Sequence, residues 1–431
     1  MNKLFAACAA AIMCFSSVAL CEEGGYVKTY AYGFPNPIGP TGMYGHKLNN
    51  RGDIPPLIVV DRIALGSPAE GIVVKDDLVV GVNGTPFAMK SDPRIALGYA
   101  MIDSESNDGV LRLTLKRRGN PLEVSIQLDR IPDYSPTWPL DCNRTDTMLM
   151  NACEFLSGQQ MPEGVVPADE GYIGQTQAGL LWLAYGEPKY MENARRSAYW
   201  YMGWLQERER QGEGIPWGPW GSAYGGIFLA EYYMMTGDRG ILPGIELLAT
   251  IMADGQLPSG GYTHGFYDGL SAGYGELSLA SMACYTSLLM AKACGVAVDT
   301  TKLRQAEVYF EKFAPPLVNR YGDHMYETQQ LGYDPMNGKV GGLAVSHILN
   351  GKDTWSQGYA IKAARSMDEV EKGHTGHFFN ILWTPVGASL APAKDIATPW
   401  IRLAGITRMP GRRAAVSNAW EQAGSTGRCR P

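Results

Sequence analysis

The chain has 431 residues, of which 45% are hydrophobic and 19% are charged, and its formal net charge is −6 at pH 7. This length is enough for two or three domains, each with a core of its own. An acidic chain with no basic block before its final tail is not typical of a protein whose main partner is nucleic acid, so that class is excluded.

Residues 1–21 have the pattern of a secretory signal peptide. Lys3 precedes an apolar run from Leu4 to Ala19, which is too short to be a stable membrane anchor. We therefore expect a periplasmic or extracellular protein. The run that ends Ala19-Leu20-Cys21 is similar to a lipobox, although Leu20 stands where a small residue is expected. The alternative is thus a lipoprotein held at the membrane through Cys21.

Five cysteines follow the signal peptide, an odd and sparse set that predicts no disulfide framework. Cys284 and Cys294 lie on one predicted helix. Ten residues of helix span about 15 Å, which is too far for a disulfide. We expect both thiols to pack in the core.

Residues 36–131 alternate in hydrophobicity as β-strands do. Asn83-Gly84 predicts a tight hairpin turn. Asp92 and Pro93 predict the start of a helix, as its cap and first residue. The strands are expected at 57–61, 77–84, 110–117 and 122–128.

Three runs in this region resemble a bacterial PDZ domain, namely Gly66-Ser-Pro-Ala69, Asp77-Leu-Val-Val-Gly-Val-Asn-Gly84 and Leu111-Arg-Leu-Thr-Leu-Lys-Arg-Arg-Gly119. Lys75-Asp-Asp77 departs from the family, which usually has glycine before its aspartate. The resemblance implies a groove in which an extended peptide, often a C-terminus, adds a strand to the sheet. The alternative is that the domain only docks on its neighbour.

The resemblance also implies that backbone N–H groups of a glycine-containing loop hold the carboxylate of the peptide. The helix from Asp92 would form the other wall of this groove. Pro40 removes one donor from the loop, which weakens carboxylate capture. The peptide-binding candidates in this loop are Gly39, Thr41, Gly42 and Met43.

Residues 132–140 form a proline-rich connector, and helical periodicity replaces strand alternation over residues 141–395. Apolar helices alternate with charged amphipathic helices in five rough repeats. A helix that is apolar all round is buried, and an amphipathic one covers it. The pattern predicts an inner and an outer ring, an α/α-toroid with the inner N-termini at one mouth. Glycine-rich entries precede the inner helices at Gly174, Gly221, Gly275, Gly341 and Gly376.

The whole arrangement resembles an uncharacterised family of secreted bacterial proteins that pair a PDZ-like domain with an α/α-toroid. The resemblance covers about Gly39 to Leu390, so the predicted fold is a multi-domain α+β protein. The toroid is similar to that of terpene cyclases and prenyltransferases, and distantly to α/α-barrel polysaccharide lyases and glycosidases. Fold likeness alone implies no reaction. The motifs that carry the resemblance are Gly39-Pro-Thr-Gly42, Gly66-Ser-Pro-Ala-Glu-Gly71, Gly261-Tyr-Thr-His-Gly265 and the run from His374 to Pro385.

The glycine-rich run 255–276 holds most of the chemistry that we expect at the mouth. A carboxylate and a histidine there can act as general acid and base on a sugar, which makes His264, Asp268 and Glu276 catalytic candidates. The alternative is that such residues bond their own loops and that the aromatic residues fill the core. Candidates for ligand binding at the mouth are Trp217, Trp220, Tyr267, His374 and His377.

Other chemistry is less well matched, and we predict no metal and no cofactor. His374 and His377 have an i, i+3 spacing that zinc ligands can use with Asp268 or His264, but this spacing is unspecific. The Asp-Asp-x-x-Asp signature for allylic diphosphates is absent. Gly269-Leu-Ser-Ala-Gly273 matches a nucleophile elbow, yet it lies among helical repeats rather than after a buried strand.

Residues 396–431 carry several arginines and lose helical periodicity, which predicts a divergent tail and an open edge to the toroid. The predicted function is that of a secreted PDZ-like protein that binds a peptide or protein partner, with a toroid mouth that binds a ligand such as a glycan. The alternatives are a carbohydrate-active enzyme, either a polysaccharide lyase or a hydrolase, and a purely structural scaffold.

Overall fold

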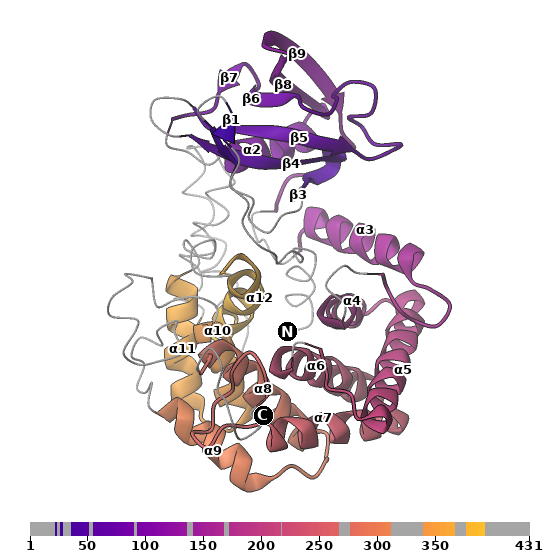
Figure 1. Ribbon diagram of the computed structural model, residues 1–431, viewed down its shortest axis with the longest axis vertical. Coiled ribbons are helices and arrows are strands. Elements are labelled where there is room, and N and C mark those ends of the chain that lie inside the picture. The colour runs from indigo at the N-terminus through magenta and orange to yellow at the C-terminus, as the bar shows by residue number, and fades with distance from the viewer. Residues whose placement is uncertain are drawn as a thin grey trace. The chain divides into compact units, whose positions relative to one another are not determined.

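The computed structural model describes residues 22–23, 26–28, 36–50, 55–89, 93–135, 141–167, 172–216, 218–266, 276–311, 339–366 and 376–392. These residues fall into two compact units, one that ends at Thr147 and one that begins at Met148. The first unit is built on an antiparallel sheet and the second is helical (Figure 1). The mixed α+β class expected from the sequence is confirmed.

The strands of the first unit form one antiparallel sheet in the order β1-β2-β4-β5-β6-β8-β9, with β3 paired to β4 and β7 paired to β6. Two described helices lie wholly in this unit, the 3-10 helix η1 (Gly39–Thr41) and α2 (Pro93–Ser106), and α3 (Asn143–Gln159) begins in it. The strands are β1 (Glu22–Glu23), β2 (Tyr26–Lys28), β3 (Asn36–Ile38), β4 (Met43–Asn50), β5 (Leu57–Ile63), β6 (Leu78–Val82), β7 (Thr85–Pro86), β8 (Val110–Arg117) and β9 (Asn120–Gln127).

Period-two alternation builds the core of the sheet unit. Leu111, Leu113 and Leu115 of β8 are fully buried, and Leu97 of α2 packs in the same cluster. Asn83 and Gly84 have φ values of 49° and 73°, the left-handed backbone that a two-residue hairpin needs between β6 and β7. The predicted turn is confirmed.

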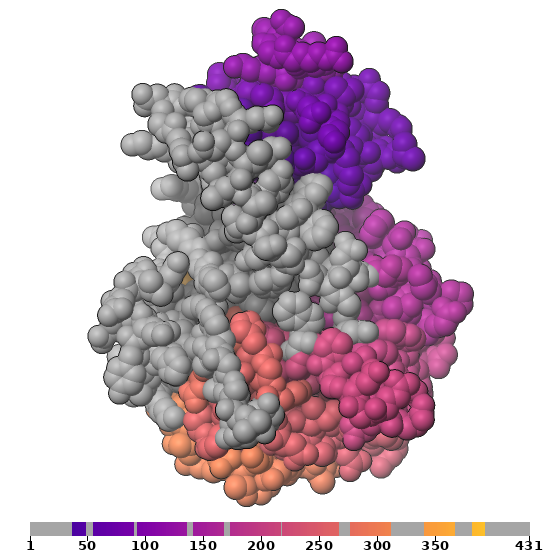
Figure 2. All heavy atoms as spheres, viewed as in Figure 1, coloured from indigo at the N-terminus to yellow at the C-terminus, as the bar shows by residue number. Residues whose placement is uncertain are grey.

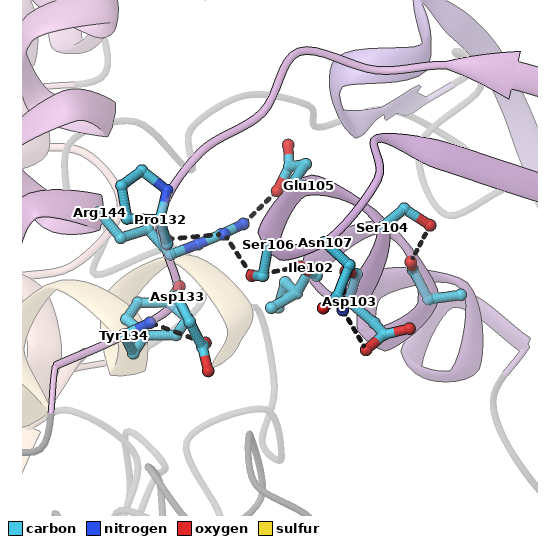
Figure 3. Close-up of polar contacts among 11 residues, drawn as sticks. Ile102, Asp103, Ser104, Glu105, Ser106, Asn107, Pro132, Asp133, Tyr134 and Arg144 are labelled. Atoms are coloured by element: carbon cyan, nitrogen blue, oxygen red, sulfur yellow. Dashed lines mark hydrogen bonds and ion pairs between the residues drawn. The ribbon is translucent and has the colours of Figure 1, made fainter.

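A buried ion pair ties the end of α2 to the first turn of α3 (Asn143–Gln159) within the sheet unit (Figure 3). The guanidinium of Arg144 bonds the carboxylate of Glu105, and both side chains are buried. Arg144 also donates to the Oγ of Ser106 and to the carbonyl oxygen of Pro132, at 3.4 and 3.3 Å. Its charge is therefore compensated by three acceptors, as a buried guanidinium requires.

The helical unit consists of alternating inner and outer helices (Figure 1). The inner helices α4, α6, α8, α10 and α12 pack one against the next, and outer helices flank them. Side chains of the outer helices α5 and α9 form its right and lower rim in Figure 2. The elements after α3 are α4 (Tyr172–Tyr185), α5 (Pro188–Gln211), α6 (Pro219–Thr236), η2 (Arg239–Ile241), α7 (Leu242–Asp254), α8 (Ser278–Ala293), α9 (Thr300–Glu311), α10 (Lys339–Leu349), α11 (Asp353–Arg365) and α12 (Gly376–Ala388).

Burial explains which helices lie inside. Every residue of α8 from Ser278 to Ala291 is buried, whereas α5 buries one face and exposes most of its charged residues. Small residues let the inner helices approach closely, since a Cβ on Gly387 of α12 would lie 2.3 Å from the Cα of Gly341 in α10. The predicted alternation of buried and amphipathic helices is confirmed.

Two loops that lead into inner helices share one Gln-x-Pro-x-Gly motif, Gln160 to Gly164 and Gln256 to Gly260. The Nε2 of Gln160 donates to the carbonyls of Gly164 and Asn193, at 3.0 and 2.9 Å. The Nε2 of Gln256 donates in the same way to the carbonyls of Gly260 and Lys302, both at 3.1 Å. Each glutamine therefore latches its loop to the next outer helix, α5 or α9.

The four described cysteines, Cys142, Cys153, Cys284 and Cys294, are free and buried. The predicted core packing of Cys284 and Cys294 is confirmed. Burial raises the pKa of the Cys153 thiol to about 12, and burial is also the main cause that raises the pKa of Cys294 to about 11. In the described part of the chain, no helix is both long and apolar enough to cross a membrane.

Candidate ligand-binding mouth of the helical unit

The loops that precede α6 and α8 lie side by side at the N-terminal ends of these helices. Gly218, with a φ of 46°, faces the loop of Gly265, because a Cβ on Gly218 would lie 3.4 Å from the Cα of Gly265 and the carbonyl oxygen of His264. Helix N-termini carry partial positive charge and unsatisfied N–H groups. The two loops form a lip that we name the mouth, comprising the described residues 215–216, 218–220, 262–266 and 276.

Trp220 and His264 join the two loops through their side chains. The indole Nε1 of Trp220 donates to Nδ1 of His264 at 3.2 Å, and the ring centroids are 6.0 Å apart. Trp220 is buried and His264 is exposed. Because Nδ1 accepts this bond, the neutral imidazole carries its proton on Nε2. The predicted mouth thus has one aromatic anchor and one polar group in contact.

Glu276 lies on the same lip because the two ends of its loop are pinned together. The backbone N–H of Leu277 donates to the carbonyl of Tyr262 at 2.8 Å, and the N–H of Tyr262 donates to Oγ of Ser281 at 2.8 Å. Tyr262 itself is fully buried and donates its hydroxyl to the carbonyl of Met252. Glu276 is half-buried and directly precedes Leu277, and His264 follows Tyr262 by two residues. The backbone bond between Leu277 and Tyr262 therefore holds Glu276 and His264 on the same lip.

The remaining mouth candidates cannot be placed in the same way. His377 lies in the first turn of α12, and nothing is described of its side chain. The structure therefore brings Trp220 and His264 into contact and places Glu276 beside them. Four predicted residues lie outside the described ones: Trp217, Tyr267, Asp268 and His374.

An aromatic stripe that the sequence analysis missed lies on α5, the helix that precedes the loop into α6. Trp200 and Trp204 stack with centroids 6.3 Å apart and planes 12° apart, and the Arg208 guanidinium lies 5.4 Å from the Trp204 ring. Arg208 also donates to the carbonyl of Gly214, in the loop before α6, at 2.9 and 2.7 Å. The i, i+4, i+8 spacing places the three residues on one helical face, a pattern that ordinary core residues share.

A carboxyl group inside the inner row was also missed. Glu231 lies on α6, and burial raises the pKa of its carboxyl above the usual value. Perturbed carboxyl groups are enriched at functional sites, although structural carboxyl groups share this property. Among the described residues, no group of three or more histidine, cysteine, aspartate or glutamate side chains is arranged to hold a metal ion.

The predicted peptide-binding loop of the sheet unit is only partly internal, since Gly39 is exposed and Gly42 is half-buried. Thr41 and Met43 are fully buried. The Thr41 hydroxyl donates to the carbonyl of Ile38 at 2.6 Å and accepts from the N–H of Met43 at 3.1 Å. Pro40 has no N–H, and the N–H of Met43 is already bonded to the Thr41 hydroxyl. Neither of these two positions therefore offers a free donor to a carboxylate.

The glycines of this loop are required by its conformation. Gly42 has a φ of 74°, and a Cβ there would lie 2.1 Å from the Cβ of Ser67. Gly39 has a φ of 52°, and a Cβ there would lie 3.0 Å from Sδ of Met101 in α2. Both positions therefore favour glycine for packing and backbone reasons.

These observations define a class of protein. It is a mixed α+β chain with a sheet unit and a helical unit, and the helical unit bears an aromatic lip. Residues 145–402 match a family profile described as a domain of unknown function, DUF6288. The match covers more than half of the chain, so the protein belongs to this family. The expectation of an uncharacterised family is confirmed to this extent. A search of curated proteins found no match.

Proposed function

We propose that the protein is a secreted PDZ-like and α/α-toroid protein, which binds a peptide or protein partner through its sheet unit and a glycan at the mouth of its helical unit. The successive packing of the inner helices and their flanking outer helices supports the toroid. The antiparallel sheet with its glycine loop and α2 supports the PDZ-like unit. The signal peptide at residues 1–21 lies outside the described residues.

The contact between Trp220 and His264 is the observation that carries the ligand proposal. Sugars expose C–H faces that stack on aromatic rings and hydroxyls that take hydrogen bonds. An imidazole with its proton on Nε2 can donate to a hydroxyl, while Arg208 links the Trp200–Trp204 stripe of α5 to the loop before α6 through the carbonyl of Gly214. The mouth therefore offers the groups that a neutral glycan requires.

Glycan binding can be tested by isothermal titration of the full chain with a panel of oligosaccharides and soluble polysaccharides. His264→Ala removes an exposed group, so we expect the protein to stay folded and to lose at least ~10-fold in affinity, which is about 1.4 kcal/mol. Lys292→Ala, an exposed change near the other end of α8, is the matched control. Equal affinities of the two variants, or no binding by the wild-type chain to any glycan, would refute the proposal.

A second candidate is a polysaccharide lyase or hydrolase that uses His264 and Glu276 as acid and base. The backbone bond between Leu277 and Tyr262 favours this enzyme, because it keeps His264 and Glu276 on one lip. Reducing-end assays and ultraviolet detection of unsaturated products distinguish the two reactions. Loss of product formation in Glu276→Gln with unchanged glycan affinity would support the enzyme. Product formation unaffected by either Glu276→Gln or His264→Ala would exclude it.

A further inference from the structure

The outer edge of β4 is already paired by the chain itself. Strand β3 runs antiparallel to it, with Asn36 opposite Gly45, Pro37 opposite Tyr44 and Ile38 opposite Met43. Strand β2 pairs with the far end of β4, from Leu48 to Asn50. A partner peptide that adds a strand needs unpaired N–H and C=O groups on this edge. The residues of β4 that pair with β3 do not offer them.

The side chain of Ile38 anchors β3 in this position. Ile38 packs against the core cluster of the sheet unit. A Cβ on Gly45 would lie 3.1 Å from Cδ1 of Ile38, so the missing side chain at Gly45 leaves the room that Ile38 takes. The next residue, Gly39, approaches Sδ of Met101 on α2. Strand β3, the space beside Gly45 and helix α2 therefore meet at one end of β4.

We propose that β3 is a resident occupant of the strand-addition groove, and that a partner peptide binds only after it displaces Asn36–Ile38 from β4. This inference rests on the proposed peptide binding by the sheet unit. The segment follows the pattern of a bound strand: it is antiparallel to β4, extended, and ends with an aliphatic residue at the glycine loop. An incoming peptide must compete with a strand that is covalently linked to its own groove.

Competition lowers the apparent affinity by the fraction of molecules whose groove is open. A groove that is open in a tenth of the molecules or fewer binds at least ~10-fold more weakly than one that is always open. A change that weakens β3 without touching β4 therefore strengthens partner binding. A change that locks β3 on β4 abolishes it.

The probe is a fluorescent peptide with the sequence of residues 33–38, Gly-Phe-Pro-Asn-Pro-Ile, titrated into the full chain and followed by anisotropy. Ile38→Asp places a charge in the space beside Gly45 and is expected to bind the probe at least ~10-fold more tightly than the wild-type chain. Ile38→Leu, which keeps the anchor, is the matched control and should bind like the wild-type chain. Circular dichroism confirms that each variant is folded.

A disulfide that joins β3 to β4 tests the same idea reversibly, because its oxidised and reduced forms are the same variant and misfolding cannot explain a difference between them. Pro37 and Tyr44 are directly opposed, and opposed Cα atoms in antiparallel strands lie about 4.5 to 5.5 Å apart, within the range of a disulfide. The double variant P37C/Y44C should lose probe binding when oxidised and regain it on reduction. Equal binding by the oxidised and reduced forms would overturn the occupant role. Failure of every form, including Ile38→Asp, to bind this probe and an array of C-terminal peptides would instead overturn peptide binding itself.

Discussion

The indole Nε1 of Trp383, on α12, donates to the hydroxyl of Tyr224, on α6, at 3.0 Å, and both side chains are buried. Helices α8 and α10 stand between them in the inner row. Packed helix axes lie 8–10 Å apart, so a straight row would hold α12 roughly 25–30 Å from α6. Direct contact therefore requires the inner row to curve, and it supports the ring that we propose.

This contact should contribute measurably to stability. Trp383→Phe keeps most of the packing but removes the donor, so we expect a loss of about 1 kcal/mol in the free energy of unfolding. Trp383→Ala also leaves a cavity and should cost about 3–5 kcal/mol. Urea unfolding of both variants, together with Tyr224→Phe and the double variant W383F/Y224F, measures the coupling. A coupling energy of zero would show that the hydrogen bond adds nothing.

The buried pair of Arg144 and Glu105 predicts a large cost for a single change in the sheet unit. Arg144→Ala leaves the carboxylate of Glu105 buried and unpaired, which should destabilise the chain by about 3–5 kcal/mol. The apolar double variant R144M/E105L should recover most of that loss. Arg195→Ala breaks an exposed pair with Glu192 and serves as the control, with an expected change below about 1 kcal/mol. Chemical unfolding measures all three.

His347 on α10 should make stability depend on pH. It is fully buried, its ring stacks on Tyr359, and neither ring nitrogen has a hydrogen-bond partner among the described residues. Burial, with a smaller effect of Lys352, lowers its pKa to about 4, and Glu307 acts weakly in the opposite sense. In the unfolded chain the histidine has its ordinary pKa of about 6.5. The folded state therefore disfavours protonation of this ring.

The unfolded state binds more protons than the folded state between about pH 4 and 6.5, so stability from this group falls as pH decreases through that window. Between pH 6.5 and pH 4 the free energy of unfolding should fall by about 3 kcal/mol because of His347. Above pH 6.5 this histidine should cause no change in stability. His347→Phe keeps an aromatic ring and should flatten the dependence, while Lys292→Ala, an exposed change on α8, should leave it unchanged. Identical pH profiles for wild-type and His347→Phe chains would contradict this assignment.

The two Gln-x-Pro-x-Gly loops, Gln160 to Gly164 and Gln256 to Gly260, should not tolerate a side chain at their last glycine. Gly164 and Gly260 have φ values of 106° and 92°, and a Cβ would lie 2.4 and 2.1 Å from the carbonyl oxygens of Arg196 and Gln305. Alanine at either position should cost at least about 2 kcal/mol, through strain and contact together. Gly295 has a φ of 81° with open space around it, so Gly295→Ala isolates the strain and should cost about 1 kcal/mol. Thermal unfolding of the three variants separates the two causes.

Local chemistry was enough to predict much of the fold. The turn at Asn83-Gly84 and the alternation of β8 are properties of neighbouring residues, and the structure confirms them. The latch of Gln256 was not predicted, because its second acceptor, the carbonyl of Lys302, is 46 residues away. The pairing of β3 with β4 was missed because a three-residue strand that contains Pro37 has almost no strand pattern of its own.

The candidate site was predicted in part for the same reason. Histidine and tryptophan near glycine-rich loops suggested a mouth, and His264 and Trp220 do meet there. The buried state of Thr41 and Met43 depends on packing with distant strands, which no local pattern reports. Trp200 and Trp204 were overlooked because half-buried tryptophans on an amphipathic helix have the same spacing as ordinary core residues.

The buried thiols give the chain its own reporters of opening. A thiol reacts as the thiolate, and burial that raises the pKa of Cys153 and Cys294 suppresses that form and blocks access to it. Alkylation in native buffer therefore proceeds only through molecules in which the surrounding helix has separated. Because Cys153 lies on α3 and Cys284 lies on α8, the labelling rate at each thiol measures how often its own helix opens, without any added probe.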